Sequence, residues 1–129
     1  MSEHLPHEDY TAAVVEALTE LGCEPANWWA ETPDGQQLDA VIDFHARISP
    51  EFWPDGVFLG WDQREGWSLT GTGESRNLYS LDLDAYANPA AVADRARAWL
   101  LGLPVTPVDE AWDGAVALQD AVERWEVNS

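Results

Sequence analysis

The sequence has 129 residues, the length of one domain with its own hydrophobic core, and 46% of them are hydrophobic, including eight tryptophans. It holds 24 acidic residues against six arginines and no lysine, which gives a formal net charge of -18. Proteins bind the phosphates of nucleic acids and of anionic membranes through Lys and Arg, so this composition excludes both as direct partners. No stretch reaches the roughly 18 apolar residues of a membrane span, and the acidic start of the chain lacks a signal sequence, so we expect a cytoplasmic protein.

The first predicted element is a helix from Glu8 to Leu21, preceded by residues 1–7, which we expect to be frayed. Its apolar residues recur at helical spacing, and Gly22 suits the position that follows a helix. Cys23 comes next and is the only cysteine. Because acidic residues flank it, we expect a buried small hydrophobic side chain and not a reactive thiol.

Five strand candidates follow, separated by turns rich in Gly, Pro, Asp and Asn. They cover residues 27–31, 38–44, 57–61, 67–72 and 78–83. Segment 38–44 alternates, with Leu38, Ala40, Ile42 and Phe44 on one face and Asp39 and Asp43 on the other. This pattern predicts a half-buried strand with an acidic, solvent-facing side in an antiparallel meander.

Two helices are predicted after the strands. The first begins at the Asn88-Pro89 pair, an N-cap followed by proline at the first helical position, and runs to Leu101. A stiff connector, residues 103–108, leads to a last helix over residues 109–126. The sequence therefore predicts one α+β domain over residues 1–129: an N-terminal helix, a five-stranded antiparallel meander and two C-terminal helices packed on one sheet face.

The segment from Leu59 to Leu69 contains Trp61-Asp62, three further residues and then Gly66-Trp67. With the leading helix and the Pro89 helix start, it resembles a group of small uncharacterised actinobacterial proteins that share a Trp-Asp, three-residue, Gly-Trp hairpin. The resemblance covers about residues 8–102 and implies no function. The order of elements also resembles small chaperone-like domains that bind other proteins, which is an analogy of fold alone.

No residue set predicts catalysis, a cofactor or a metal. His4 and His7 have a spacing that two metal ligands could use, but they lie at a chain end and flank Pro6. His45 has acidic neighbours and no recognisable nucleophile. Asp39 and Asp43 share a strand face but are separated by roughly 13 Å, too far for a carboxylate pair.

Four aromatic residues suggest an interaction surface. Trp28 and Trp29 are consecutive in a strand and must point to opposite faces, so one of them is a candidate for exposure. If it lies beside Phe52 and Trp53, the two segments form an apolar patch ringed by acids such as Asp39 and Asp43. The alternative is that the helices cover all of these aromatic side chains.

Two functions are compatible with this pattern. The first is a non-catalytic protein-binding module that associates with itself as a homodimer or captures a protein partner, which the charge suggests is basic. The second is a DNA mimic whose carboxylates occlude a nucleic-acid-binding protein. Residues 1–65 carry fourteen acids and two arginines, a net -12, against -6 for residues 66–129, which favours the first half as the working side. A third reading, an enzyme with a pocket near His45 and the Ser49–Gly56 loop, has no motif behind it.

Overall fold

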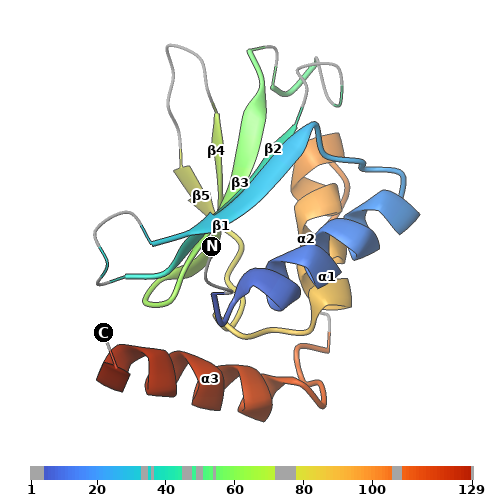
Figure 1. Cartoon of the computed structure of the whole chain (residues 1–129). Helices are drawn as coiled ribbons and strands as arrows, with labels where there is room; N and C mark the ends of the chain where they lie inside the picture. The colour runs from blue at the N-terminus through green and yellow to red at the C-terminus, as the bar shows by residue number, and fades with distance from the viewer. Residues whose placement is uncertain are drawn as a thin grey trace.

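In the described part of the chain, five antiparallel strands form one sheet and three helices complete the fold (Figure 1). The computed structural model describes residues 5–32, 35, 37–44, 48, 51–53, 55–71, 78–105 and 109–128. In chain order the elements are α1 (Glu8–Glu20), β1 (Asn27–Glu31), β2 (Asp39–Phe44), β3 (Val57–Asp62), β4 (Gly66–Gly71), β5 (Leu78–Ser80), α2 (Pro89–Leu101) and α3 (Ala115–Asn128). The α+β class, the five-stranded meander and the helix order predicted from the sequence are confirmed.

The strands lie in the sheet in the same order as in the chain, β1-β2-β3-β4-β5, and each pairs with the next in antiparallel register. One predicted strand is too long: β5 ends at Ser80 and not at Leu83. Asp82 has a φ of 55°. This left-handed conformation is uncommon for a residue with a side chain and is incompatible with an extended strand.

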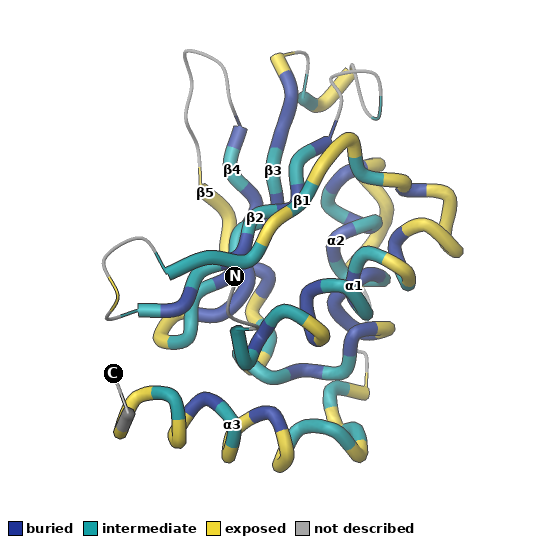
Figure 2. Tube along the Cα trace, in the orientation of Figure 1, coloured by how far each residue is buried: buried dark blue, intermediate teal, exposed yellow. Residues whose placement is uncertain are grey.

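The two faces of the sheet are unequal. One face is covered by α1 and α2 and forms the core, whereas none of the described helices lies over the opposite face (Figures 1 and 2). The core-facing side chains of the three central strands are all buried: Ala40, Ile42, Phe44, Val57, Leu59, Trp61, Trp67 and Leu69. Each fully buried large side chain of this kind contributes about 1.5–3 kcal/mol, so this face holds the layers together.

A hydrogen-bonded aromatic network closes one end of the core. Three consecutive carbonyl groups each accept a hydrogen bond from an aromatic side chain of a different part of the chain: Ala85 from Trp61 Nε1 (2.6 Å), Tyr86 from Trp112 Nε1 (2.7 Å) and Ala87 from the Tyr10 hydroxyl (2.6 Å). Trp67 Nε1 completes the network by donating to the Tyr10 hydroxyl at 3.0 Å. Because buried indole and phenol groups need polar partners, these bonds fix how β3, β4 and α1 meet.

Residues 5–7 belong to this packed end, which corrects the expectation of a frayed segment up to residue 7. His7 is fully buried and stacks on Trp61 with ring centroids 5.2 Å apart. Its Nε2 lies 2.7 Å from the carbonyl oxygen of Asp39 and donates to it. A tertiary hydrogen bond and a stacking contact therefore order a chain end that the sequence alone presents as loose.

The last helix starts later than predicted. It begins at Ala115 and not at residue 109, because tertiary contacts hold the preceding segment in another conformation. The Glu110 carbonyl accepts a hydrogen bond from the Asn88 amide, and Trp112 packs its ring on Tyr10 and against Gly114. From α3 itself, Leu118 and Val122 enter the core. Residues 106–108 of the predicted connector lie outside the described residues.

Two smaller expectations concern Cys23 and membranes. Cys23 is 1% exposed, as predicted, and burial raises the pKa of its thiol although Arg97 acts in the opposite direction. None of the described helices has the length and hydrophobicity that a membrane crossing needs.

Candidate interaction surface

The face of the sheet opposite α1 and α2, called the open face below, has none of the described helices over it. Its side chains alternate with those of the core, and none of them is buried. By register they are Asn27, Trp29, Glu31, Asp39, Val41, Asp43, Phe58, Gly60, Asp62, Ser68, Thr70, Leu78 and Ser80. Two of the six residues that the sequence proposed for partner binding, Asp39 and Asp43, therefore lie on the same face as a third, Trp29.

Carboxylates form a row across this face. Glu31 is opposite Asp39, and Asp39 is opposite Asp62, so three acids occupy one line over β1, β2 and β3. Neighbouring strands are about 4.8 Å apart, and like charges directly opposite each other destabilise a sheet. Asp43, four residues along β2 from Asp39, adds a fourth carboxylate to the same face.

Two of these acids also have local hydrogen bonds. Asp62 Oδ1 accepts the backbone amides of Arg64 and Glu65 at 2.8 and 2.7 Å and so shapes the β3–β4 turn. Asp39 Oδ1 accepts from Gln37 Nε2 at 3.2 Å. No strand carries Lys or Arg. The described strands therefore supply acidic side chains and no basic ones to the open face.

Apolar side chains lie between the acids. Trp29 is 40% exposed and is opposite Val41, which in turn is opposite Gly60. The Phe58 ring leans toward Gly60, since a Cβ at that glycine would lie 3.6 Å from it. At the far edge Leu78 is 64% exposed. Aromatic and aliphatic groups beside carboxylates are a typical composition for contact with another protein.

The remaining three sequence candidates lie elsewhere. Trp28 is opposite Ile42, so it points to the core side and packs against the core. Trp53 contacts Tyr79 of β5, with ring centroids 5.7 Å apart, and its Nε1 lies 3.5 Å from the Trp99 carbonyl. β1 and β5 are opposite edges of the sheet, roughly 19 Å apart at ordinary strand spacing. The structure therefore does not bring Phe52 and Trp53 together with Trp28 and Trp29 into one patch.

Phe52 and Trp53 form part of a second aromatic cluster at the C-terminal end of α2. Phe52 is 52% exposed and its ring lies over Gly102, where a Cβ would approach it to 2.4 Å. Tyr79 stacks on Trp99 at 5.3 Å in the same region. This cluster attaches β5 to α2 and carries no acidic row.

The histidines give no catalytic or metal site in the described part of the chain. His7 uses Nε2 for the Asp39 carbonyl, and desolvation by burial lowers its pKa despite that bond and the nearby carboxylates of Asp39 and Glu8. Among the described residues no group of three or more His, Cys, Asp or Glu side chains is placed to hold a metal ion. His4 and His45 lie outside the described residues, as do parts of the Ser49–Gly56 loop.

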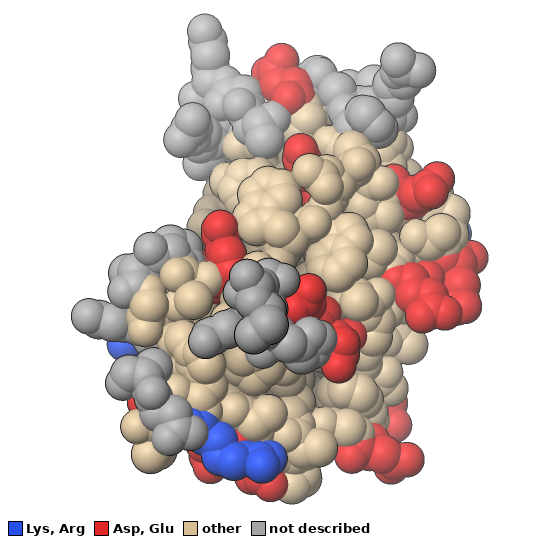
Figure 3. All heavy atoms as spheres, viewed as in Figure 1, with Lys and Arg blue, Asp and Glu red and all other residues tan. Residues whose placement is uncertain are grey.

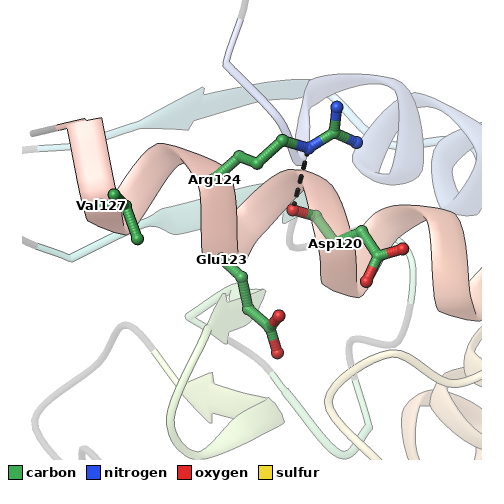
Figure 4. Close-up of a pocket in the computed structure, with 4 residues that line it drawn as sticks. All are labelled: Asp120, Glu123, Arg124 and Val127. Atoms are coloured by element: carbon green, nitrogen blue, oxygen red, sulfur yellow. Dashed lines mark hydrogen bonds between the residues drawn. The ribbon is translucent and has the colours of Figure 1, made fainter.

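A shallow hollow of about 550 Å³ lies on the surface of α3 (Figure 4). Asp120, Glu123, Arg124 and Val127 line it, and Arg124 Nε donates to the Asp120 carbonyl of the same helix at 3.3 Å. All four residues come from two turns of one helix. The hollow therefore lacks the convergent side chains from several elements that catalytic sites use.

The sequence missed several members of the open face. Glu31, Phe58, Asp62 and Leu78 were placed in or beside strands, but only the register between strands shows that they share a face with Trp29. The signal available was the alternation of β2, which already put Asp39 and Asp43 on the solvent side. Extending that alternation through each antiparallel pair would have found the rest.

A protein-family model matches residues 10–98, and its description is "Family of unknown function (DUF6292)". The match takes in nearly all of α1, the five strands and most of α2, and it ends before α3. It supports the resemblance to a family without an established activity. No curated protein and no solved structure matches the chain.

Proposed function

Because the chain belongs to the DUF6292 family of unknown function, we propose from its own surface that it is a non-catalytic binding domain which captures a basic protein partner on the open face. One observation carries this proposal: the row Glu31–Asp39–Asp62 on the open face, with Trp29 exposed next to it and Asp43 further along β2 on the same face. Two like charges 4 Å apart repel by roughly 1 kcal/mol in water and by more near a protein surface. Cationic groups of a partner would remove this repulsion on binding.

The charge of the open face also favours a different protein over a second copy of this chain as the partner. Two open faces brought together would oppose four carboxylates with four more, without a basic residue on either set of strands. Like-charge juxtaposition at an interface costs several kcal/mol. A basic partner is therefore favoured over self-association through this face.

DNA mimicry is a second candidate because carboxylates stand in a row on one surface, as a mimic requires. The row is short, however: beyond Asp62 the next residue in line is Gly66. Proteins that bind DNA tightly contact about 6–10 phosphates. The mixture of acids with Trp29, Val41 and Phe58 fits a basic, partly apolar protein segment better than it fits a copy of a phosphate backbone.

The test measures binding of a synthetic peptide of alternating Arg and Val by calorimetry, at low and at physiological ionic strength. Asp43→Asn and Glu31→Gln each remove one charge from the open face. Glu16→Gln, on the exposed side of α1, removes the same charge elsewhere and serves as the matched control. We expect each open-face variant to weaken binding about fivefold, the equivalent of about 1 kcal/mol for one partly exposed ion pair.

The control variant is expected to bind within about twofold of the parent protein, since long-range attraction is screened at physiological ionic strength. Equal weakening by Glu16→Gln and Asp43→Asn would mean general attraction to an acidic protein and would contradict a defined site. Duplex DNA that competes for the domain's natural partner would favour mimicry. A dimer in light scattering that dissociates when Trp29→Ser is introduced would favour self-association.

A further inference from the structure

We propose that the basic partner binds as an extended segment that adds a sixth strand to the sheet along β1. This inference rests on the proposed function and specifies the form of its partner. An edge strand presents a row of backbone N–H and C=O groups that have no strand partner on one side. Peptides commonly bind to such edges by main-chain hydrogen bonds, with alternate side chains providing the selectivity.

β1 is a regular edge. It lies at the end of the strand order and pairs with β2 through five consecutive residue pairs, Asn27↔Asp43 to Glu31↔Asp39, without a bulge. Natural edge strands are usually protected by proline, lysine, a bulge or short length. β1 has none of these protections, and its one outward-facing charge, Glu31, has the sign that a basic strand would match.

The other edge is protected. β5 has three residues, Leu78–Ser80, and the positive φ of Asp82 ends the extended backbone soon after it. A strand added there would gain few main-chain bonds. The two edges therefore differ, and an incoming segment is expected at β1.

β1 ends the strand order, so no described strand lies beyond its outer edge. In Figure 1 β1 is drawn in front of the other strands, and no helix passes in front of it. Figure 3, from the same viewpoint, shows acidic groups among uncharged side chains on this side of the molecule, with basic side chains toward the lower left. A sixth strand would lie about 4.8 Å from β1 and would extend the acidic row and the apolar surface at Trp29.

The register defines the chemistry of the partner. On the open face, every second residue of the added strand would lie next to Asn27, Trp29 or Glu31. A basic residue fits beside Glu31, and an arginine fits over the exposed Trp29 ring as a cation–π contact. On the other face the neighbours are Trp28 and Ala30, which favour small or branched apolar residues. The partner is thus a segment in which basic and apolar residues alternate.

The experiment compares the alternating Arg-Val peptide with two versions that carry N-methyl groups on backbone nitrogens. One version is methylated at every Arg and the other at every Val, so that side chains and charge are unchanged. In a strand, successive N–H groups point to opposite edges, so only one version blocks the edge that faces β1. We expect one methylated peptide to lose about tenfold or more in affinity, as several main-chain bonds are lost, and the other to bind within about twofold.

Amide hydrogen exchange gives the second measurement. Bound parent peptide is expected to slow exchange of β1 amides and to leave those of β5 unchanged. If both methylated peptides bind like the parent while Asp43→Asn still weakens binding, strand addition is wrong and the proposed function stands. If the parent peptide does not bind, or binds Glu16→Gln and Asp43→Asn with equal loss, the proposed function itself is wrong.

Discussion

Trp61 and Trp67 are directly opposite each other across the β3–β4 hairpin, with ring centroids 6.4 Å apart and both side chains buried. Each indole donates outside the hairpin, to the Ala85 carbonyl and to the Tyr10 hydroxyl. Between them, Asp62 holds the turn. The Trp-Asp, three-residue, Gly-Trp segment is therefore a device that fixes the hairpin to α1 and to residues 85–87, and its residues serve the fold.

Removal of the Tyr10 hydroxyl tests this network. In Tyr10→Phe the Trp67 indole loses its acceptor and the Ala87 carbonyl loses its donor, both in the core. We expect a loss of about 1–3 kcal/mol in the free energy of unfolding, measured by urea denaturation. Tyr79→Phe is the control, because Tyr79 is 36% exposed, and we expect a change within about 0.5 kcal/mol. Equal effects of the two substitutions would contradict the role of the network.

Replacement of Gly66 is predicted to destabilise the fold for a steric reason. Gly66 has a φ of 80°, and a Cβ there would lie 3.3 Å from the Ala85 Cα and 3.4 Å from the Leu83 carbonyl oxygen. Gly35 has a similar φ of 72°, and a Cβ there would meet no atom of the described residues within 4 Å. Both alanine variants should lose about 1–2 kcal/mol from backbone strain, and Gly66→Ala should lose more because of the contact. Thermal unfolding of the pair checks the difference, and Gly35→Ala as the more damaging change would refute it.

His7 should make stability depend on pH. Burial lowers its pKa in the folded state below the ordinary 6.5, so the unfolded chain binds the proton more readily than the folded chain. The contribution of His7 to stability is thus full above about pH 6.5 and is lost as pH falls toward the lowered folded-state pKa. His7→Gln keeps a donor for the Asp39 carbonyl but has no proton to bind.

The measurement for His7 is the free energy of unfolding of both proteins between pH 7.5 and pH 5.5, a window about one unit on each side of the ordinary histidine pKa. The difference between the parent protein and His7→Gln should shrink as pH falls. A constant difference would mean an unshifted pKa and a growing difference a raised one, and either result would contradict this prediction. Carboxylates common to both proteins cancel in this comparison.

Cys23 is expected to resist modification in the folded protein. Its side chain is 1% exposed and burial raises its pKa, so little thiolate is available. A thiol-reactive reagent should label it only as the domain opens, with complete labelling in urea. Stoichiometric labelling within seconds under native conditions would contradict the buried position.

The sequence predicted helix boundaries correctly where local signals determine them. α2 was bounded correctly because Asn88 Oδ1 caps the Ala90 amide, Pro89 takes the first helical position and Gly102 adopts a φ of 67°. The start of α3 was missed because Trp112 is held by Tyr10 and Tyr86, which are distant in sequence. Tertiary contacts of this kind override local helix preference.

The sequence predicted only some residues of the candidate surface, for a related reason. Alternation placed Asp39 and Asp43 on the solvent side, and a strand must send Trp28 and Trp29 to opposite faces. Which tryptophan is exposed, and that Trp53 contacts Tyr79 at the opposite edge, depend on the register and order of five strands. Those relationships are long-range, and no single segment encodes them.

The three carbonyl groups at residues 85–87 have a consequence for how relatives would be compared. Their partners, Trp61, Trp112 and Tyr10, are recognisable as letters in a sequence, whereas the acceptors are main-chain atoms that every amino acid supplies. Substitution at 85–87 leaves the acceptors in place, provided the backbone path is kept. An alignment would therefore display the side-chain half of each bond and conceal the main-chain half. For Trp112, which stacks on Tyr10, the side-chain half also lies beyond the matched residues 10–98.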